Sequence, residues 1–205
     1  MTTDGQRTDG RAARAERTRD AVVEAFLTLT EEGHLRPTAK LISERAGVSL
    51  RSVFQHFEDL ETLFAAAADR QVERLMPLYS EIPADIPFED RLSRFVSMRS
   101  SILEAISPVR RSAVLAEPFS PVIQQRLRWF RERSREEVLR VFSGELAALP
   151  PDEHLTAEFA LHAATEWYTW ETLRTHSGLS LDCACSVMAL TIRRLLAPAV
   201  FAAAS

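Results

Sequence analysis

A short run of polar and basic side chains has the composition that base recognition requires. Residues 49–56 read SLRSVFQH. An arginine can donate two hydrogen bonds to O6 and N7 of guanine, and a glutamine can pair in the same way with N6 and N7 of adenine. Arg51 and Gln55 are one helical turn apart, so both could reach base edges from one helix face. The hydroxyls of Thr38, Ser49 and Ser52 are suited to phosphate oxygens.

The elements that would position these side chains are two short helices, expected at 39–46 and 50–56. Thr38 and Ser49 can cap them, and Gly47 permits the left-handed turn between them. Helices of two turns are marginal in water, so they must pack on a neighbour. An apolar set can close this core against an expected first helix, which ends near Gly33: Phe26, Leu29, Ile42, Ala46, Val48, Val53 and Phe57. The spacing predicts a helix-turn-helix.

At these residues the chain resembles the TetR family of bacterial transcriptional regulators. The resemblance covers roughly residues 15–65 and runs through Phe26, Gly33, Thr38, Ile42, Ala46-Gly47-Val48-Ser49, Phe54-Gln55-His56-Phe57, Glu61 and Leu63. It implies that Thr38 contacts a phosphate and that residues 49–52 and 55–56 face a DNA groove. The expected DNA-contacting set is Thr38, Lys40, Ser49, Leu50, Arg51, Ser52, Gln55 and His56.

Two positions depart from the family pattern, which usually has tyrosine in place of Phe54 and often lysine in place of Leu60. Both family residues commonly touch the DNA backbone, so their loss predicts a weaker salt dependence of binding. Arginines near the amino terminus could compensate: Arg7, Arg11, Arg14, Arg17 and Arg19. Alternatively, Glu16 and Asp20 pair with some of them.

The helical periodicity between the prolines and glycines of the chain predicts an all-α protein of about nine helices. We expect a flexible arm at 1–13, a DNA-binding domain at 14–60 and a ligand-binding and dimerisation domain at 61–205. Beyond the motif, helices are expected at 60–80, 88–106, 109–117, 121–147, 152–176 and 181–203, with a break at Ser107-Pro108.

The last two expected helices are apolar on more than one face, which calls for cover by a second subunit. The resemblance implies a four-helix dimer interface at the same place. The residues expected there are Phe159, Ala163, Trp167, Trp170, Leu190 and Arg194. A two-fold dimer predicts an imperfectly palindromic operator with half-sites about 34 Å or somewhat more apart.

The resemblance also implies an effector cavity within the larger bundle. Candidate lining residues are Phe95, Met98, Arg99, Phe119, Trp129, Phe130, Trp167 and Tyr168. Aromatic residues at helical spacing more often belong to the hydrophobic core than to the lining of a ligand pocket. Arg99 would favour an anionic or carbonyl-bearing ligand if it faced inward, and we expect it to be a solvated surface charge instead.

We recognise no catalytic motif in the sequence, and we expect no metal and no cofactor. His162 and Glu166 are four residues apart, but two ligands without a third favour a half-buried, hydrogen-bonded histidine. Cys183 and Cys185 point to different sides of a helix and are expected to be buried or half-buried free thiols in a reducing cytoplasm. No segment has the length and apolarity of a signal peptide or membrane span.

The net charge of −4 first argues against a nucleic-acid partner. However, residues 1–56 hold nine basic and eight acidic side chains (+1), and the other 149 hold sixteen and twenty-one (−5). We therefore expect a transcriptional repressor that a small-molecule effector releases from double-stranded DNA. The alternatives are a helical small-molecule carrier or sensor with a vestigial motif, and an enzyme built around His162, Glu166 and the cysteines.

Overall fold

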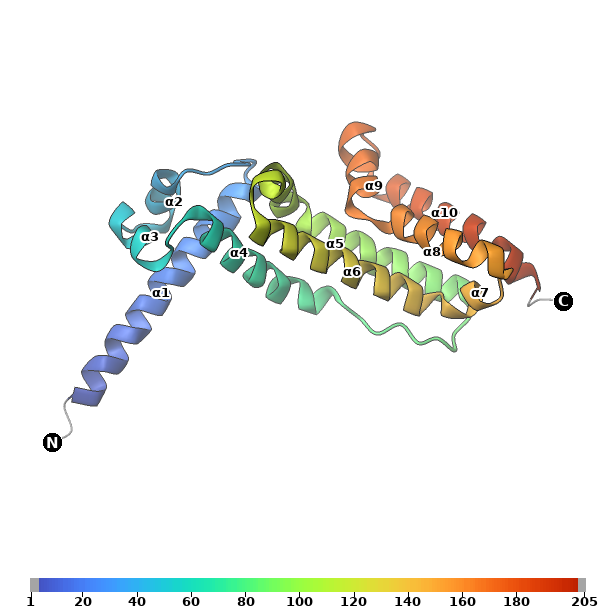
Figure 1. The fold of residues 1–205 in the computed structure, drawn as a ribbon, viewed down its shortest axis with the longest axis horizontal. Coiled ribbons are helices and arrows are strands. Elements are labelled where there is room, and N and C mark those ends of the chain that lie inside the picture. The colour runs from blue at the N-terminus through green and yellow to red at the C-terminus, as the bar shows by residue number, and fades with distance from the viewer. Residues whose placement is uncertain (1–3, 203–205) are drawn as a thin grey trace. The chain divides into compact units, whose positions relative to one another are not determined.

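The computed structural model describes residues 4–202, and over these residues it contains helices and no strand (Figure 1). The expected all-α class is confirmed. The chain divides into two compact units, and neither is continuous in sequence. The first comprises residues 1–74 and 108–127, and the second comprises residues 75–107 and 128–205.

The first unit contains the two short helices expected from the sequence. It is built from α1 (Asp4–Glu31), α2 (Ala39–Ala46), α3 (Leu50–His56) and most of α4 (Leu60–Leu75). It also includes the end of α5 (Phe88–Ala116), a 3-10 turn at Glu117–Phe119 and the start of α6 (Pro121–Val141). The DNA-binding domain expected at 14–60 is therefore only part of a larger packed unit.

The core of the first unit explains why α2 and α3 are stable despite their length. Ile42 from α2 and Val53 from α3 are completely or almost completely buried in one cluster with apolar residues of α1 and α4. Phe26 of α1 and Phe64 of α4 meet edge to face in that cluster, with ring centroids 5.9 Å apart. The tertiary contacts of these residues supply the stability that a two-turn helix lacks on its own.

The second unit contains the larger part of the bundle. A 3-10 turn at Met76–Leu78 leads through an irregular segment into α5, and the greater parts of α5 and α6 also belong to this unit. After α6 come α7 (Ser143–Ala147), α8 (Pro151–Thr165), α9 (Trp167–Glu171), a π-helical turn at Thr172–His176, and α10 (Leu181–Ala202). Helices α8 and α10 pack against each other.

Three expected helix boundaries are wrong. Helix α5 continues through Pro108 although proline removes one helical hydrogen bond. Buried residues before and after the proline, Leu103 and Val109, hold the helix together. The helix expected at 121–147 divides after Val141, and the helix expected at 152–176 divides at Glu166, whose backbone is extended (φ −78°, ψ 155°).

The amino-terminal segment also differs from expectation. Residues 4–13, expected to form a flexible arm, are helical and continue α1 without interruption. Alanines at 12, 13 and 15 favour this outcome, because alanine has the highest helix propensity. Residues 1–3 of the expected arm lie outside the described residues.

Candidate nucleic-acid interface

Both helices of the motif begin at a side-chain cap. The Thr38 hydroxyl oxygen accepts a hydrogen bond from the Leu41 amide at 3.3 Å, and the Ser49 hydroxyl oxygen accepts one from the Ser52 amide at 3.1 Å. Gly47 ends α2 in the left-handed region (φ 67°), which a residue with a side chain rarely adopts. The Thr38 hydroxyl proton is not used by its cap, so it can still be donated to a phosphate.

Helix α3 divides into a buried and an exposed face. Val53 of α3 and Phe57, the residue directly after the helix, are buried, whereas Arg51 and Gln55 are exposed. Neither Arg51 nor Gln55 has a hydrogen-bond or ion-pair partner among the side chains that the structure describes. Their donors are therefore available to bases, as the spacing predicts.

The rest of the expected contact set surrounds this pair. Ser52 and His56 are half-buried, and the Ser49 and Ser52 hydroxyl oxygens lie 2.9 Å apart. Lys40 is exposed on α2 and lies 3.9 Å from Glu44, a contact too exposed to hold the ammonium group in place. Leu50 is exposed.

Phe54 and Leu60, the two departures from the family pattern, are also largely exposed, at 52% and 42% of their surface. Neither side chain can donate a hydrogen bond to a phosphate. Arg19, one of the arginines expected to compensate on the DNA backbone, makes a contact that the sequence did not indicate: its guanidinium lies 5.3 Å from the centre of the Phe57 ring. This cation–π contact joins α1 to the end of α3.

We expect Ser49→Ala to lower the free energy of unfolding by about 1 kcal/mol, because the Ser52 amide loses its cap. Ser49→Asp restores a capping oxygen and should keep the stability, but its negative charge should weaken DNA binding. Urea unfolding and DNA titration of both variants check this. Equal stability of the alanine variant and the wild type would contradict the capping role.

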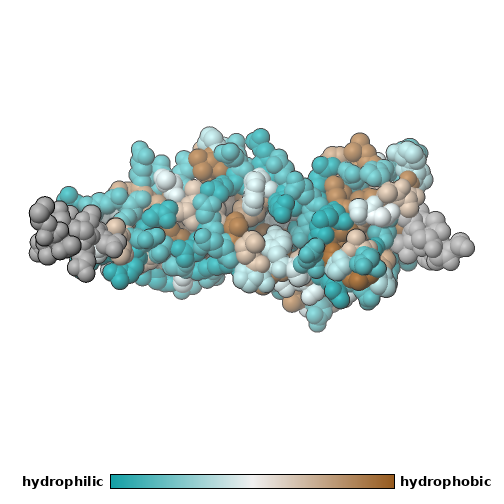
Figure 2. Space-filling model, turned by 90° about the horizontal axis from the view of Figure 1, so that it is seen from below, coloured by the Kyte–Doolittle hydropathy of each residue, from teal (hydrophilic) through white to brown (hydrophobic). Residues whose placement is uncertain are grey.

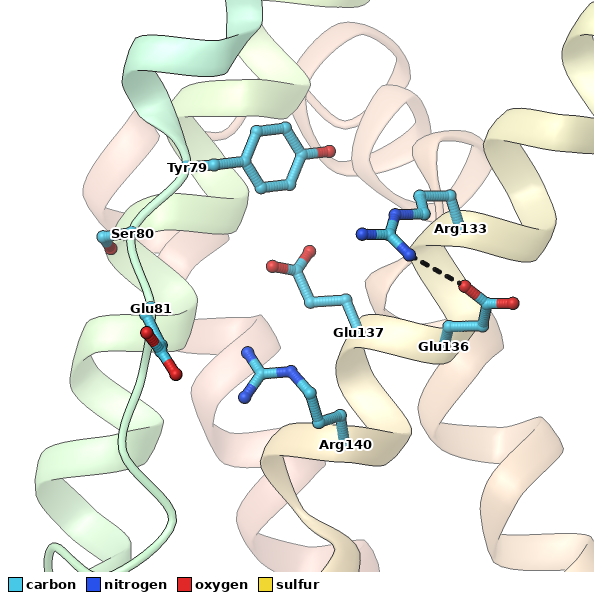
Figure 3. A pocket seen from close by; sticks show the side chains of 7 residues that line it. All are labelled: Tyr79, Ser80, Glu81, Arg133, Glu136, Glu137 and Arg140. Atoms are coloured by element: carbon cyan, nitrogen blue, oxygen red, sulfur yellow. Dashed lines mark hydrogen bonds and ion pairs between the residues drawn. The ribbon is translucent and has the colours of Figure 1, made fainter.

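A polar cleft lies in the second unit, between the segment at 79–81 and α6 (Figure 3). Its volume is about 370 Å³, within the usual range for small-molecule sites. Figure 3 shows Tyr79, Glu137 and Arg140 pointing into the same space, while Arg133 pairs with Glu136 at 3.1 Å. The lining residues are Tyr79, Ser80, Glu81, Arg133, Glu136, Glu137 and Arg140.

A buried ion pair supports one wall of this cleft. Arg99 is only 2% exposed, and its guanidinium donates to the Glu137 carboxylate at 3.1 Å and to the Ser134 carbonyl at 3.1 Å. It also donates to the Ser134 hydroxyl and lies over the Phe95 ring at 5.1 Å. The expectation that Arg99 is a solvated surface charge is therefore wrong. Burial lowers the pKa of Arg99, and the neighbouring Glu137 carboxylate opposes that effect.

Burial also affects Tyr79, whose pKa is raised first by desolvation and then by the Glu137 charge. The phenol therefore stays protonated and can donate a hydrogen bond. The cleft thus combines a phenol, carboxylates and guanidinium groups, and such a set suits a small molecule that carries both charge signs. Arg133, Glu137 and Arg140 recur on one side of α6, but their alternating charge looks in the sequence like an ordinary solvated face.

The eight residues expected to line an effector cavity do not converge on this cleft. Phe95 and Met98 are core residues, and the Met98 sulfur accepts a hydrogen bond from the Ser80 amide at 3.4 Å. Phe119 lies in the first unit, where it is 82% exposed at an apolar groove. The remaining aromatic residues are dispersed: Trp129 and Tyr168 are exposed, Phe130 is half-buried and Trp167 is buried.

Two residues expected at the dimer interface are buried within the protomer. The Trp167 indole donates to the Ser107 hydroxyl at 3.0 Å, and the Trp170 indole donates to the Glu104 carboxylate at 2.8 Å. The break at Glu166 permits both contacts, since an uninterrupted helix would point these indoles differently. Trp167 and Trp170 are therefore core residues, which corrects their assignment to the interface.

The other expected interface residues form an exposed surface on α8 and α10, which we call the α8–α10 face. Phe159 is 55% exposed and Leu190 is 51% exposed, and Ala163 and Arg194 are also exposed. Leu155 and Val187 add further exposed apolar side chains to the same two helices. Several large apolar side chains exposed on two packed helices are a candidate for a protein contact.

The histidines and cysteines singled out in the sequence lie as follows. The His162 Nε2 lies 3.7 Å from a Glu166 carboxylate oxygen, and burial lowers the pKa of this histidine. Over the described residues, no group of three or more His, Cys, Asp or Glu side chains could hold a metal. Cys183 and Cys185 are free, as expected, but Cys183 is exposed rather than buried. No helix in the described part of the chain is long and apolar enough to cross a membrane.

Comparison by sequence finds a partial match to transcriptional regulators. No protein-family model matches the chain. Over 64 residues it is 42% identical to uncharacterised HTH-type transcriptional regulators of Mycobacterium tuberculosis and Mycobacterium bovis, and the match covers 29% of this chain. The matched part of the chain spans 33% of the length of these curated relatives.

Comparison by structure covers nearly the whole chain. A transcriptional regulator from Rhodococcus sp. RHA1 superposes with a TM-score of 0.67 at 19% identity, over 90% of this chain and 96% of the other. A putative TetR-family regulator from Mesorhizobium loti gives 0.60 at 17% identity, over 90% and 97%. A structure of the multidrug binding protein EbrR complexed with imidazole gives 0.55 at 20% identity, over 89% of each chain. The chain therefore has the fold of the TetR family of transcriptional regulators.

Proposed function

We propose that the chain is a sequence-specific DNA-binding transcriptional regulator that acts as a homodimer. The observation that carries the proposal is the capped pair α2 and α3, which holds Arg51 and Gln55 exposed and without intramolecular partners. The 42% identity with HTH-type regulators over 64 residues supports the same function. The α8–α10 face supplies the contact between two copies, so the operator is expected to be an imperfect palindrome.

The finer part of the proposal is that the protein represses transcription until an effector binds in the second unit. The cleft beside Tyr79 and Glu137 is the candidate effector site because it combines suitable volume with convergent polar groups. A ligand releases DNA only as far as it binds the DNA-incompetent conformation more tightly. The multidrug binding of the structural neighbour EbrR is consistent with an effector of this kind.

One experiment tests both parts. Genomic fragments selected by the purified protein are sequenced, footprinted and then used in a screen of small polar molecules for DNA release. A protected imperfect palindrome, with reduced transcription from the adjoining promoter in vitro, is the expected result. Absence of any preferred fragment contradicts the regulator, and a palindrome that no molecule releases contradicts the effector response.

A small-molecule carrier with a vestigial motif is the second candidate, favoured by the exposed apolar side chains of Phe54 and Leu60. The two functions differ in salt dependence. A plot of log K against log salt with a slope near zero on every duplex tested supports the carrier, because a DNA-binding protein releases counterions.

Arg51→Ala is expected to weaken binding to the selected operator by about 1–3 kcal/mol and to relax the base preference at one position of each half-site. The reason is loss of a bidentate contact to guanine. Fluorescence anisotropy on the operator and on single-base variants measures both effects. Arg94→Ala, which removes an exposed arginine of the second unit, serves as the control. Unchanged base preference in Arg51→Ala rules out the base contact.

A further inference from the structure

The amino-terminal half of α1 has its arginines on one side of the helix. Arg14 and Arg17 are exposed and have no ion-pair partner among the described side chains. The backbone is helical from Asp4, so positions 7 and 11, which are also arginines, occupy the preceding turns. At 3.6 residues per turn, positions 7, 11, 14 and 17 fall within about 120° of the helix circumference. We call this the arginine face.

The nearest described acidic residues of α1, Glu16, Asp20 and Glu24, do not neutralise Arg14 and Arg17. By the same periodicity position 16 lies on the opposite side of the helix, whereas position 20 lies about 60° from position 17, at the edge of the arginine face. Asp20 pairs with Arg70 of α4 at 2.7 Å, and Glu24 pairs with Arg70 at 3.6 Å and with Arg74. These carboxylates are committed to the contact between α1 and α4, and they leave the arginine face with its positive charge.

This part of α1 projects from the packed first unit. The core begins at Val22, and the seventeen residues from Asp4 to Asp20 extend about 26 Å at 1.5 Å per residue. Figure 1 shows this segment free of α2, α3 and α4. In Figure 2 hydrophilic residues dominate the surface next to the grey amino-terminal residues. The contact of Arg19 with Phe57 fixes the base of the segment beside the end of α3.

We propose that the arginine face binds the phosphate backbone of duplex DNA next to the site that α3 reads. The inference rests on the proposed DNA-binding function and adds a second contact surface to it. Duplex DNA carries one negative charge per about 1.7 Å of its axis, so a helix face that presents arginines, with Arg14 and Arg17 exposed, is complementary to it. The surface replaces phosphate contacts that Phe54 and Leu60 cannot make, since both are exposed and apolar.

The test measures the salt dependence of binding and does not require a known operator. The full chain is titrated onto a fluorescent duplex of random sequence over a series of KCl concentrations. The double variant Arg14→Gln/Arg17→Gln should reduce the slope of log K against log salt by about 1.8, since each phosphate contact contributes about 0.9. The variant Arg7→Gln/Arg11→Gln should give a comparable reduction. Circular dichroism checks that helicity is kept.

The matched control is Arg94→Gln/Arg128→Gln, which removes the same charge from exposed positions of the second unit and should leave the slope unchanged. An equal loss in this control means that net charge alone acts and overturns the inference. A change of less than about 0.5 in both α1 variants also overturns it. In that case Arg51-dependent binding would preserve the proposed function, whereas salt-independent binding by the wild type would remove both.

An anionic membrane surface is the other partner that such a face could meet. Vesicles of phosphatidylserine and phosphatidylcholine, with phosphatidylcholine alone as reference, distinguish it. Vesicle binding that requires Arg14 and Arg17, together with an unchanged DNA slope, overturns the inference in favour of a lipid partner. Loss of DNA slope without vesicle binding supports the arginine face as a DNA contact.

Discussion

Arg99→Ala is expected to lower the free energy of unfolding of the second unit by about 3–5 kcal/mol, because it leaves the Glu137 carboxylate without its buried partner. The Glu137 side chain is only 12% exposed, so water cannot replace the guanidinium fully. The Ser134 carbonyl and hydroxyl lose donors at the same time. A loss of this size is a large part of the free energy of unfolding of a typical domain.

Urea unfolding followed by tryptophan fluorescence measures this loss in the relevant unit, since Trp129, Trp167 and Trp170 all belong to the second unit. Arg94→Ala removes an exposed arginine from the same helix and should change stability by less than about 0.5 kcal/mol. The double variant Arg99→Met/Glu137→Leu should recover most of the loss, because a buried ion pair replaced by apolar groups is often neutral. A loss below about 1 kcal/mol in Arg99→Ala would show that the pair is effectively solvated.

The parts of the fold that could be predicted from the sequence are those with local causes. Helices α2 and α3 begin and end where Thr38, Gly47 and Ser49 indicate, because capping and left-handed turns depend on neighbouring residues. The exposure of Arg51 and Gln55 followed from the same spacing. The conformation and exposure of these residues could be predicted without knowledge of the rest of the chain.

The parts that could not be predicted depend on distant partners. Pro108 ordinarily ends a helix, and only the burial of residues on both sides of it keeps α5 continuous. Trp167 looked like interface because its partner, Ser107, is 60 residues away in sequence. Arg99 looked like surface because its burial depends on Ser134 and Glu137 of another helix. In each case tertiary contacts override a sound local rule.

Phe159→Arg is expected to convert the proposed homodimer into monomers and to weaken operator binding by about 10²- to 10⁴-fold. The side chain is 55% exposed in the protomer, so the substitution should leave the fold intact. In a two-fold interface it introduces two charges into apolar surface, and an anchor of this kind is typically worth about 2 kcal/mol or more. The larger effect on DNA arises because a monomer loses the effective concentration that tethers the second recognition helix.

Sedimentation velocity and operator titration separate the dimer from its consequence. Met76→Arg places the same charge at a position that is 60% exposed but lies outside α8 and α10, and it should remain dimeric with unchanged operator affinity. A monomeric Phe159→Arg protein that binds the whole operator as tightly as the wild type would mean that each subunit reads DNA independently. A dimeric Phe159→Arg protein would place the contact elsewhere. We expect the Phe159→Arg protein to be a monomer and to bind an isolated half-site with the same weak affinity as the wild type. Both results together arise only if the α8–α10 face couples the two DNA-binding units of a dimer.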